Sequence, residues 1–435
     1  MLDPKLIRDN PDAVIKAAKD KKVVVDVKKI LKLDAEKRKL QTESEGIRAE
    51  QKKLSALIPK AVAKERAKLL KDTMKLKEKL QKFEVKLQKL DAELQPLLWL
   101  LPNVPDADVP VGPDESANKP IRMWGEPRSF AFTPKQHFEL GAMLDVLDNE
   151  RAAKTSGARF TFVKGKLALL QFALLQHVMR IVTSEETLAH IAKDADLNVD
   201  TRPFIPVIPP VLIRPEMLNR MARLEPKDER YHIPSDDLYL IGSAEHTLGS
   251  MHADEAIDEQ DAPRRYIGYS PSFRREAGSY GKDTRGIIRL HQFDKLELES
   301  FTLPDVSRKE QEFFVAIQEH LMQSLNLPHR VVMVCTGDMG GPDARQIDIE
   351  TWMPGQDAYR ETHSADFMAD YQARRLGTRI RRKDGSHVYA HMNDGTAAAM
   401  GRLLACIMEN YQEEDGSIGV PEVLIPYCGF DKITK

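Results

Sequence analysis

Two long runs of hydrophobic residues at helical spacing occupy most of residues 28–98. In the first run an apolar residue recurs every seven positions, at Leu33, Leu40, Ile47 and Leu54, although polar residues share this face. In the second run the steps mostly alternate between four and three residues, at Leu69, Leu76, Leu80, Phe83, Leu87, Leu90 and Leu94. This spacing is typical of a coiled-coil seam, and Pro59 disfavours one continuous helix. The pattern predicts an antiparallel helical hairpin, here called the arm, over about residues 28–98.

Short helices are expected before the arm, and a domain boundary after it. Asp3 and Asn10 each precede a proline, so each offers a capping side chain beside a residue suited to the first helical turn. Residues 101–120 contain five prolines and several acidic residues, which is typical of a linker. We therefore expect a helical domain over residues 1–110 and a globular domain over residues 111–435.

The second domain alternates short apolar segments with helical ones. A helix that is apolar on most faces is predicted at 167–182, followed by a polar, acid-rich helical insertion at 185–202. The apolar segment 204–215 contains Pro206, Pro209 and Pro210, so it is expected to be an edge or interface strand. Buried strands are expected at 238–248, 331–336 and 346–353, and a last helix at 394–411 with Arg402 about two turns in. The pattern predicts an α+β fold with a mainly antiparallel sheet.

Charge is distributed unevenly along the chain. The formal net charge is only −2, yet residues 21–95 hold 22 Lys/Arg and 12 Asp/Glu, a net charge of +10. Many of these basic residues lie between 52 and 79, near the expected tip of the arm. Such a surface favours a nucleic-acid backbone, bound by shape and position more than by base sequence. The alternatives are a coiled coil for dimerisation and an ordinary solvated helical face.

Cysteine usage and hydropathy indicate a cytoplasmic protein without a membrane segment. The three cysteines lie far apart with no paired spacing, so neither a disulfide framework nor a zinc site is expected. The N-terminal residues carry charges every few positions, unlike a signal peptide, and no run of about 18 apolar residues occurs.

Residues 273–297 combine positive charge with an aromatic ring and contain the strongest candidate for a ligand site. Their arginines are Arg274, Arg275, Arg285 and Arg289. A turn is expected at 278–283, followed by a strand whose alternation places on one face Ile287, Arg289, His291 and Phe293. Guanidinium groups bind phosphate bidentately, and a phenylalanine ring can stack on a nucleobase. The stretch predicts a nucleotide site, with a salt-bridged surface hairpin as the alternative.

The chain resembles bacterial-type seryl-tRNA synthetases, a family of class II aminoacyl-tRNA synthetases, over nearly its whole length. The arm matches the family's N-terminal coiled coil, which implies tRNA binding. Residues 273–297 (FRREAGSYGKDTRGIIRLHQFDKLE) match motif 2, and residues 394–412 (DGTAAAMGRLLACIMENYQ) match motif 3, with Arg402 as its arginine. Motif 1, which forms the dimer interface in this family, corresponds to the helix before Pro209 and Pro210. A GxxxxGK[ST] loop is absent from the sequence, in agreement with a class II site that uses arginines.

The resemblance implies an ATP site with three catalytic arginines, Arg274, Arg289 and Arg402. Arg274 would bind the α-phosphate, whereas Arg402, aided by Arg289, would bind the γ-phosphate. Glu276 would lie near the adenine amino group, Phe293 would stack on adenine, and Leu290 would add a backbone contact. The other implied ATP-binding residues are Arg275, Glu361, Thr362, His363 and Ser364, of which Glu361 and Ser364 are also the implied ligands of Mg²⁺.

The resemblance also implies a pocket for L-serine, formed by Ser243, Ala244, Glu245, Arg274, Glu297 and Thr396. A buried carboxylate that faces the substrate hydroxyl would discriminate against alanine, which leaves that carboxylate without its partner. The sequence departs from the family's pattern at three places. Ser243 replaces the threonine of Thr-Ala-Glu, Asp394 replaces an asparagine of motif 3, and ETHSADF at 361–367 replaces ExSSCSN.

Four further polar residues invite catalytic roles. His291 and His363 are expected to be hydrogen-bonding spacers beside the phosphate site. Asp348 and Glu350 are expected to serve magnesium or structure, because adenylate formation needs no pair of acid–base carboxylates.

The resemblance implies a homodimeric serine–tRNA ligase. Such an enzyme activates serine with ATP to seryl-adenylate and transfers the seryl group to the 3′ end of tRNA(Ser), with tRNA(Sec) as a second candidate substrate. A paralogue that passes a small amino acid to a non-tRNA acceptor is the first alternative. A catalytically inert coiled-coil adaptor is the second.

Overall fold

The computed structural model describes residues 1–277 and 285–435, which form two compact units, Met1–Pro102 and Asn103–Lys435. The division lies within the proline-rich segment, before the boundary expected at 110. This segment is packed rather than loose, because the Asn103 side chain is buried and donates 2.8 Å hydrogen bonds to the carbonyls of Pro342 and Met368. The turn predicted at 278–283 lies outside the described residues.

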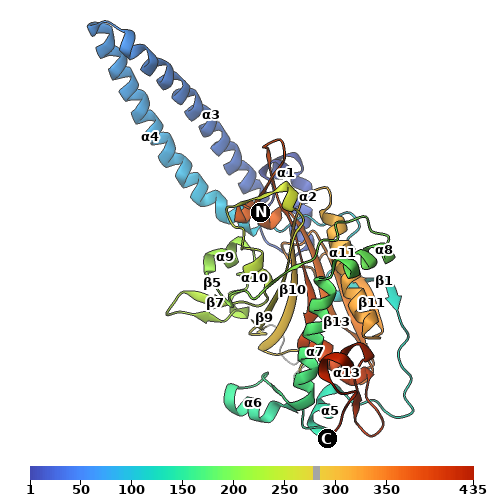
Figure 1. Cartoon of the computed structure of the whole chain (residues 1–435). Helices are drawn as coiled ribbons and strands as arrows, with labels where there is room; N and C mark the ends of the chain where they lie inside the picture. The colour runs from blue at the N-terminus through green and yellow to red at the C-terminus, as the bar shows by residue number, and fades with distance from the viewer. Residues whose placement is uncertain (278–284) are drawn as a thin grey trace. The chain divides into compact units, whose positions relative to one another are not determined.

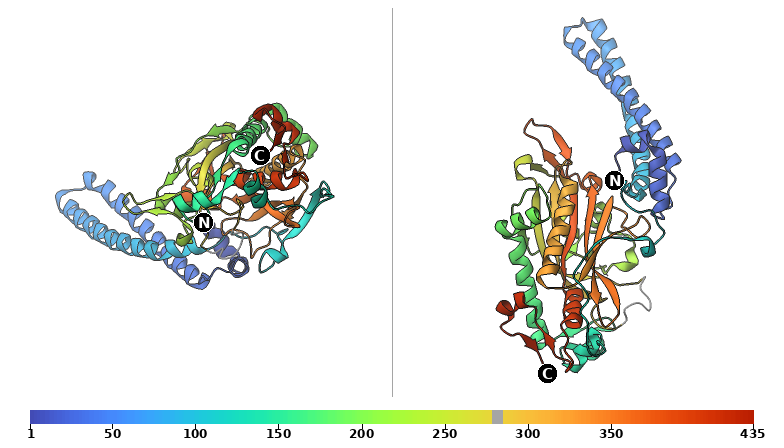
Figure 2. Two further views of the ribbon diagram at one scale, coloured as in Figure 1. Left: turned by 90° about the horizontal axis from the view of Figure 1, so that it is seen from below. Right: turned by 90° about the vertical axis from the view of Figure 1, so that its right-hand side faces the viewer.

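The first unit contains two short helices and the predicted arm. Helices α1 (Pro4–Asp9) and α2 (Pro11–Asp20) begin at the expected prolines, each capped by the preceding Asp3 or Asn10 side chain. The arm consists of α3 (Val27–Leu57) and α4 (Ala63–Leu100), joined by the short 3₁₀ turn η1 (Ile58–Lys60). Figure 2 shows that α3 and α4 lie side by side as an antiparallel pair.

An apolar seam holds the two arm helices together. Its buried hydrophobic residues include Leu33 and Ile47 of α3 and Leu80, Leu90 and Leu94 of α4. Ser44, one of the polar residues along the seam, is also buried, since its small side chain fits between the helices. The ion pairs Lys29–Glu93 (2.9 Å) and Arg48–Glu84 (3.0 Å) match this antiparallel register. Such exposed pairs contribute less than about 1 kcal/mol each, so the seam supplies most of the stabilisation.

The second unit is built around an eight-stranded sheet. In order across the sheet its strands are β1 (Lys119–Trp124), β11 (His329–Met333), β12 (Arg345–Met353), β13 (Ala358–Ala369), β16 (His391–Ala399), β10 (Gln292–Thr302), β9 (Arg264–Phe273) and β4 (Ile205–Val207). All neighbours are antiparallel except β4 and β9. The edge position of β4 agrees with its proline content. The predicted α+β fold with a mainly antiparallel sheet is confirmed.

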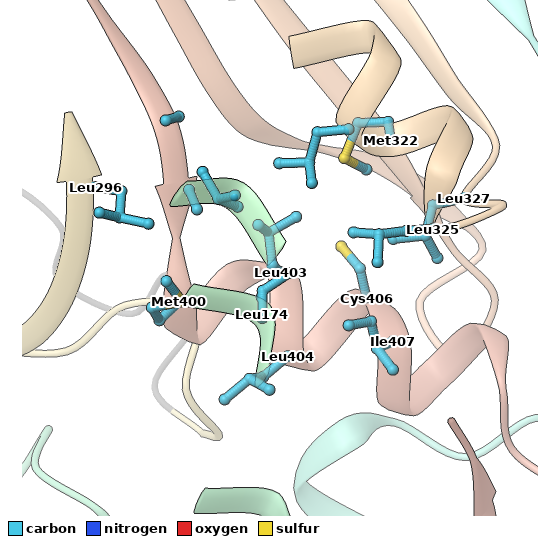
Figure 3. Close-up of a cluster of buried hydrophobic side chains, with 14 of the residues drawn as sticks. Leu174, Leu296, Met322, Leu325, Leu327, Met400, Leu403, Leu404, Cys406 and Ile407 are labelled. Atoms are coloured by element: carbon cyan, nitrogen blue, oxygen red, sulfur yellow. The ribbon is translucent and has the colours of Figure 1, made fainter. Parts of the chain in front are cut away.

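Three helices cover one face of this sheet (Figure 1): α7 (Gly165–Val182), α11 (Ser307–Ser324) and α13 (Met400–Asn410). Figure 3 shows part of the core that they form, in which Leu174 of α7, Leu296 of β10 and Met322 of α11 lie around Leu403 of α13. Since side chains of a strand alternate between faces, burying Leu296 and Leu298 here directs Lys295 and Glu297 to the other face. The opposite face of the sheet is therefore polar.

Shorter elements surround the sheet. The remaining helices are α5 (His137–Met143), α6 (Asn149–Ser156), α8 (Glu185–Asp194), α9 (Pro215–Arg220), α10 (Glu245–Leu248), α12 (Tyr371–Leu376) and α14 (Ile425–Cys428). One three-stranded sheet contains β5 (Leu212–Ile213), β7 (Leu238–Leu240) and β6 (His232–Ile233). A second contains β15 (His387–Tyr389), β14 (Arg379–Arg381) and β8 (Ala256–Asp258). Two further pairs are β2 (Leu147–Asp148) with β3 (Phe162–Val163) and β17 (Ile418–Gly419) with β18 (Lys432–Ile433). Among the described residues no single helix is long and apolar enough to cross a membrane, and α7 with α8 reaches that length only as a pair bent by 77°.

Four predicted elements have different limits in the structure. The segment predicted as a helix from 394 lies in β16 up to Ala399, so Arg402 is in the first turn of α13 rather than two turns in. Pairing of Thr396, Ala398 and Ala399 with β10 overrides the helical propensity of the alanines. The strand expected to include 287–291 begins only at Gln292, and the strand expected at 238–248 ends at Leu240. The helical insertion expected up to 202 ends at Asp194.

Candidate active site

A pocket of about 230 Å³ lies over the polar face of the sheet. It is lined by residues from β10, β13 and β16, from the first turn of α13, and from the segment 287–290 before β10. The predicted site residues that line it are Glu245, Arg274, Glu276, Arg289, Leu290, Phe293, Glu297, Glu361, Thr362, Ser364, Thr396 and Arg402. The structure thus brings together most of the residues singled out from the sequence.

One end of the pocket is cationic. Arg402 pairs with Glu361 at 2.8 Å, and Arg289 pairs with Glu276 at 2.7 Å. Glu361 raises the pKa of Arg402, and Arg402 in turn lowers the pKa of Glu361 against the effect of burial. Arg274 donates from Nε to the Gly242 carbonyl at 3.1 Å. These guanidinium groups remain charged at any physiological pH and offer several N–H donors to an anion.

Phe293 gives the cationic end an aromatic wall. The guanidinium carbon of Arg274 lies 5.4 Å from the centre of the Phe293 ring. Ile288 and Leu290, from the segment before β10, also line this part of the pocket. The prediction that Ile287, Arg289 and His291 share one face of a strand is wrong. This segment is irregular, and the successive residues 287–290 all line the pocket. An apolar wall beside arginines suits a flat, phosphorylated ligand.

The other end of the pocket carries a buried acidic group with close polar partners. Glu297 accepts a hydrogen bond from the Ser243 hydroxyl at 2.7 Å and forms an ion pair with Lys295. Burial raises the pKa of Glu297, which Lys295 partly offsets. Thr396 of β16 stands opposite Glu297 in register, so its side chain lies on the same face. A carboxylate with two hydroxyl groups nearby can bind a small polar molecule by several hydrogen bonds.

Asp348, Ser364 and Glu361 form an oxygen-rich group, of which Ser364 and Glu361 line the pocket. Asp348 stands opposite Ser364 in register, and burial together with Glu361 raises the pKa of Asp348 well above its usual range. The Ser364 hydroxyl donates to Asp366 at 2.8 Å. Carboxylate and hydroxyl oxygens are the donors that Mg²⁺ prefers, so this set fits that ion. Glu350 instead pairs with Arg330 and does not line the pocket.

Four predicted site residues do not line the pocket. Arg275 is exposed, and its guanidinium carbon lies 5.7 Å from the centre of the Tyr231 ring. His363 is buried beside Thr362, and burial lowers its pKa to about 3, so it is neutral. Ala244 is fully buried in a neighbouring core, and Ser243 reaches the site through its hydrogen bonds with Glu297 and Lys295.

Arg223 lines the pocket but was not predicted from the sequence. It follows α9, outside every motif quoted above, and its Nε lies 3.1 Å from the Glu245 carboxylate. Lys295, Gln346 and Asp366 were likewise missed. Lys295 could have been found from alternation with Glu297 along β10, whereas no local pattern marks Arg223.

Family models match both units of the chain. A model of the seryl-tRNA synthetase N-terminal domain matches residues 1–105, and a model of the class II tRNA synthetase core domain (G, H, P, S and T) matches residues 229–411. The first covers the arm and the second covers most of the pocket residues. Both matches agree with the resemblance based on the motifs.

Individual proteins of the same family are similar to the chain over its full length. A serine–tRNA ligase of Symbiobacterium thermophilum is 40% identical over the whole of both chains, and one of Thermotoga petrophila is 45% identical over 78% of this chain and 76% of its own. The crystal structure of seryl-tRNA synthetase from Pyrococcus horikoshii complexed with ATP has a TM-score of 0.87 and 36% identity, covering 100% of this chain and 99% of that one. The cytoplasmic serine–tRNA ligase of Naegleria fowleri in complex with AMP has a TM-score of 0.84 and 29% identity, with coverage of 100% and 99%. The chain therefore belongs to the seryl-tRNA synthetase family of class II aminoacyl-tRNA synthetases.

Proposed function

We propose that the chain is an ATP-dependent serine–tRNA ligase that forms seryl-adenylate and then seryl-tRNA. The observation that carries this proposal is the single pocket with Arg274, Arg289 and Arg402 at one end and the buried Glu297 and Thr396 at the other. The cationic end suits a triphosphate, and the acidic end suits a small hydroxy amino acid. Full-length similarity to serine–tRNA ligases supports the same conclusion.

In the first step, a carboxylate oxygen of serine attacks the α-phosphorus of ATP. A bond forms between these two atoms, the bond from the α-phosphorus to the bridging oxygen breaks, and pyrophosphate leaves with that electron pair. Arg274 would bind the α-phosphate, while Arg402 and Arg289 would bind the γ-phosphate. The step needs no protein nucleophile, because fixed cations and correct positioning lower the barrier.

Adenine would stack on the Phe293 ring. The Arg274 guanidinium carbon lies 5.4 Å from the centre of this ring, so the group that would bind the α-phosphate borders the adenine site. Glu276 would approach the adenine amino group once Arg289 turns toward phosphate, since these two side chains now pair. Leu290 would contribute a backbone contact at the rim.

Glu361 and Ser364 would hold Mg²⁺, with Asp348 beside them. Their oxygens suit this ion, and Glu361 would exchange its pairing with Arg402 for the metal when ATP binds. Bound there, Mg²⁺ supplies positive charge to the phosphate oxygens.

Serine specificity would arise at the acidic end. Glu297 would accept a hydrogen bond from the substrate hydroxyl, with Thr396 beside it, and Glu245 would face the ammonium group. Glu297 is 1% exposed, so a substrate without a hydroxyl would leave its carboxylate poorly solvated. Sites of this kind discriminate strongly against analogues that lack the polar group. Ser243 would hold Glu297 in place through its 2.7 Å hydrogen bond.

In the second step, a hydroxyl oxygen of the terminal ribose of tRNA attacks the seryl carbonyl carbon. The bond from that carbon to the phosphate oxygen of AMP breaks, AMP leaves with the electron pair, and the hydroxyl proton passes to the departing phosphate. The arm would bind the body of tRNA(Ser). Ten basic residues near its tip are exposed: Lys52, Lys53, Lys60, Lys64, Arg66, Lys68, Lys71, Lys75, Lys77 and Lys79. Such a surface binds a phosphate backbone by charge and shape.

The active form would be a homodimer with an interface at motif 1. Exposed apolar residues occur in and beside this segment, including Phe172 of α7 (55% exposed) and Ile208 after the edge strand β4 (87% exposed). Exposed apolar groups on neighbouring elements are typical of an obligate interface. Light scattering during size-exclusion chromatography would test this, with twice the chain mass expected.

Serine-dependent exchange of pyrophosphate into ATP, followed by transfer of labelled serine to total tRNA, tests the function. We expect exchange with serine, much weaker exchange with alanine or threonine, and charging of a tRNA fraction. Exchange without transfer would support the paralogue that uses another acceptor. Absence of exchange with every amino acid would support the inert adaptor and refute the proposal.

A further inference from the structure

Arg223 is a largely buried cation that joins several separate segments around the acidic end of the pocket. It follows α9 through Ala222, whose backbone is left-handed (φ +58°), a conformation that alanine rarely adopts. This turn directs the Arg223 side chain inward, where it is 15% exposed. Its Nε lies 3.1 Å from Glu245, and its Nη2 lies 3.4 Å from Asp394 and 3.7 Å from Asp343.

These ion pairs come from distant parts of the fold. Glu245 begins α10, Asp394 lies in β16, and Asp343 lies in the loop before β12. Glu245, Asp343 and Asp394 raise the pKa of Arg223, against the effect of burial, so the side chain is permanently charged. One guanidinium group therefore fixes the relative positions of three segments that border the pocket.

The sheet beneath Arg223 carries a row of acidic residues. Asp366 of β13 stands opposite Asp394 of β16, and Asp394 in turn stands opposite Glu299 of β10. All three side chains are less than a tenth exposed. Directly paired acidic residues repel one another when charged, and burial adds to that cost. Burial and the neighbouring carboxylates therefore raise the pKa of Asp366, Asp394 and Glu299 well above the usual range, and Arg223 offsets part of this rise.

Two members of this row are departures from the family's pattern. Asp394 stands where motif 3 has asparagine, and Asp366 stands where ExSSCSN has serine. Each replacement adds a carboxylate next to the pocket. Arg223 faces both, since it pairs with Asp394 and its interaction with Asp366 is also attractive. The buried arginine and the two extra acids thus form one electrostatic unit.

We propose that Arg223 is a positioning residue for the amino-acid end of the site, which fixes the Glu245 carboxylate and stabilises the ionised form of Asp394. This inference rests on the proposed function, because Glu245 is assigned there to the substrate ammonium. Without Arg223, Glu245 loses its closest cation, and Asp394 is left without a partner of opposite charge within 4 Å among the described residues. Serine binding should suffer most, because the phosphate-binding arginines Arg289 and Arg402 have other partners.

Pyrophosphate exchange by full-length Arg223→Met, Arg223→Lys, Asp394→Asn and the double variant Arg223→Met/Asp394→Asn tests the proposal. We expect Arg223→Met to raise KM for serine at least about tenfold and to change KM for ATP less than about twofold. Arg223→Lys keeps the positive charge but lacks the planar guanidinium group, so a smaller rise in the KM for serine is expected. Adding Asp394→Asn to Arg223→Met should lower serine KM again by about threefold or more, because it removes the unpaired carboxylate.

Several outcomes would overturn the inference. Equal changes in the two KM values, or a fall in kcat alone, would contradict a role in the amino-acid end. A double variant no better than Arg223→Met would contradict the coupling to Asp394. Circular dichroism identifies variants that fail to fold. If Arg223→Met does not fold, the same comparison is made between Arg223→Lys and the double variant Arg223→Lys/Asp394→Asn. A wild-type chain without serine-dependent exchange would overturn the proposed function and this inference with it.

Discussion

Glu409 of α13 and His137 of α5 form a fully buried pair in which Nδ1 of the imidazole lies 2.8 Å from the carboxylate. Nε2 of the same ring accepts a hydrogen bond from the backbone N–H of Ile287 at 3.2 Å. Because Nε2 is the acceptor, the ring proton is on Nδ1 and points to Glu409. Ile287 lines the pocket, so this pair connects the helical core to the segment that carries Arg289. Gly286, with φ +80°, lies against the ring, where a side chain would clash with Nε2.

Replacing Glu409 with glutamine tests the importance of this pair. The carboxylate accepts hydrogen bonds from the backbone N–H groups of His137 and Gly355 and from the Gln356 side chain. An amide would direct N–H groups at some of these donors. We expect Glu409→Gln to lower the free energy of unfolding by about 2–4 kcal/mol, measured by urea denaturation.

Glu413→Gln is the matched control for this change. Glu413 follows the same helix but pairs with Arg128 at the surface, with both side chains more than two-fifths exposed. Its replacement should change the free energy of unfolding by less than about 0.5 kcal/mol. Equal effects of the two substitutions would mean that the buried pair contributes no more to the free energy of unfolding than the exposed one.

Arg274 and Arg275 are adjacent in the sequence but lie in different surroundings, which makes them a matched pair for mutagenesis. Arg274→Ala should reduce pyrophosphate exchange by at least about a thousandfold, since it removes the proposed contact to the reacting phosphate. Binding of tRNA, measured by filter retention, should be nearly unchanged. Arg275→Ala should retain exchange within about fivefold, because Arg275 is exposed and contacts Tyr231 outside the pocket. Loss of both exchange and tRNA binding in Arg274→Ala would indicate a structural role instead.

The helical arm and the antiparallel sheet could be predicted because both follow from local periodicity. Proline at position 59 and the apolar steps of three and four determine the arm, and Pro206 explains why β4 is an edge strand. Segments near the site were predicted less well. Gly395 and the alanines up to Ala399 have the composition of a helix start, but pairing with β10, and with β13 at Gly395, makes them part of β16.

The site residues outside the motifs could not be predicted, because long-range contacts select them. Arg223 and Asp343 are 120 positions apart and meet only in the folded chain, at 3.7 Å. Arg275 shows the converse, since its place in an arginine-rich motif suggested a ligand contact that its exposed position does not support. Motif matches identified the pocket, whereas packing decides which neighbours line it.

Shortening the arm should separate the two proposed steps. Replacing residues 40–87 by a short glycine-serine turn leaves the lower part of the arm paired, where Lys29–Glu93 and Lys37–Asp91 join the helices. We expect pyrophosphate exchange to stay within about twofold of wild type, because the pocket lies wholly in the second unit. Charging of tRNA should fall by at least about a hundredfold. Unchanged charging would refute the assignment of the arm to tRNA.

A milder variant controls for damage to the arm. Lys71→Glu, Lys75→Glu and Lys79→Glu together reverse exposed charges on α4 without removing its seam. This variant should remain helical by circular dichroism but raise KM for tRNA at least about tenfold at low salt. The difference in KM from wild type should diminish as the salt concentration increases, because the lost contribution to tRNA binding is electrostatic.

His363 should make the protein less stable in mild acid. Burial lowers its pKa to about 3 in the folded state, against 6.5 in the unfolded chain. The unfolded state therefore binds a proton first as pH falls below 6.5, so stability present above that pH is lost between 6.5 and about 3. Between pH 7.5 and pH 5 this group alone accounts for about 2 kcal/mol. His363→Gln should reduce the fall in unfolding free energy over that interval by the same amount, measured by urea denaturation at both pH values. His190→Gln, at an exposed position on α8, should leave the fall unchanged, and an equal effect of both substitutions would contradict the role of burial.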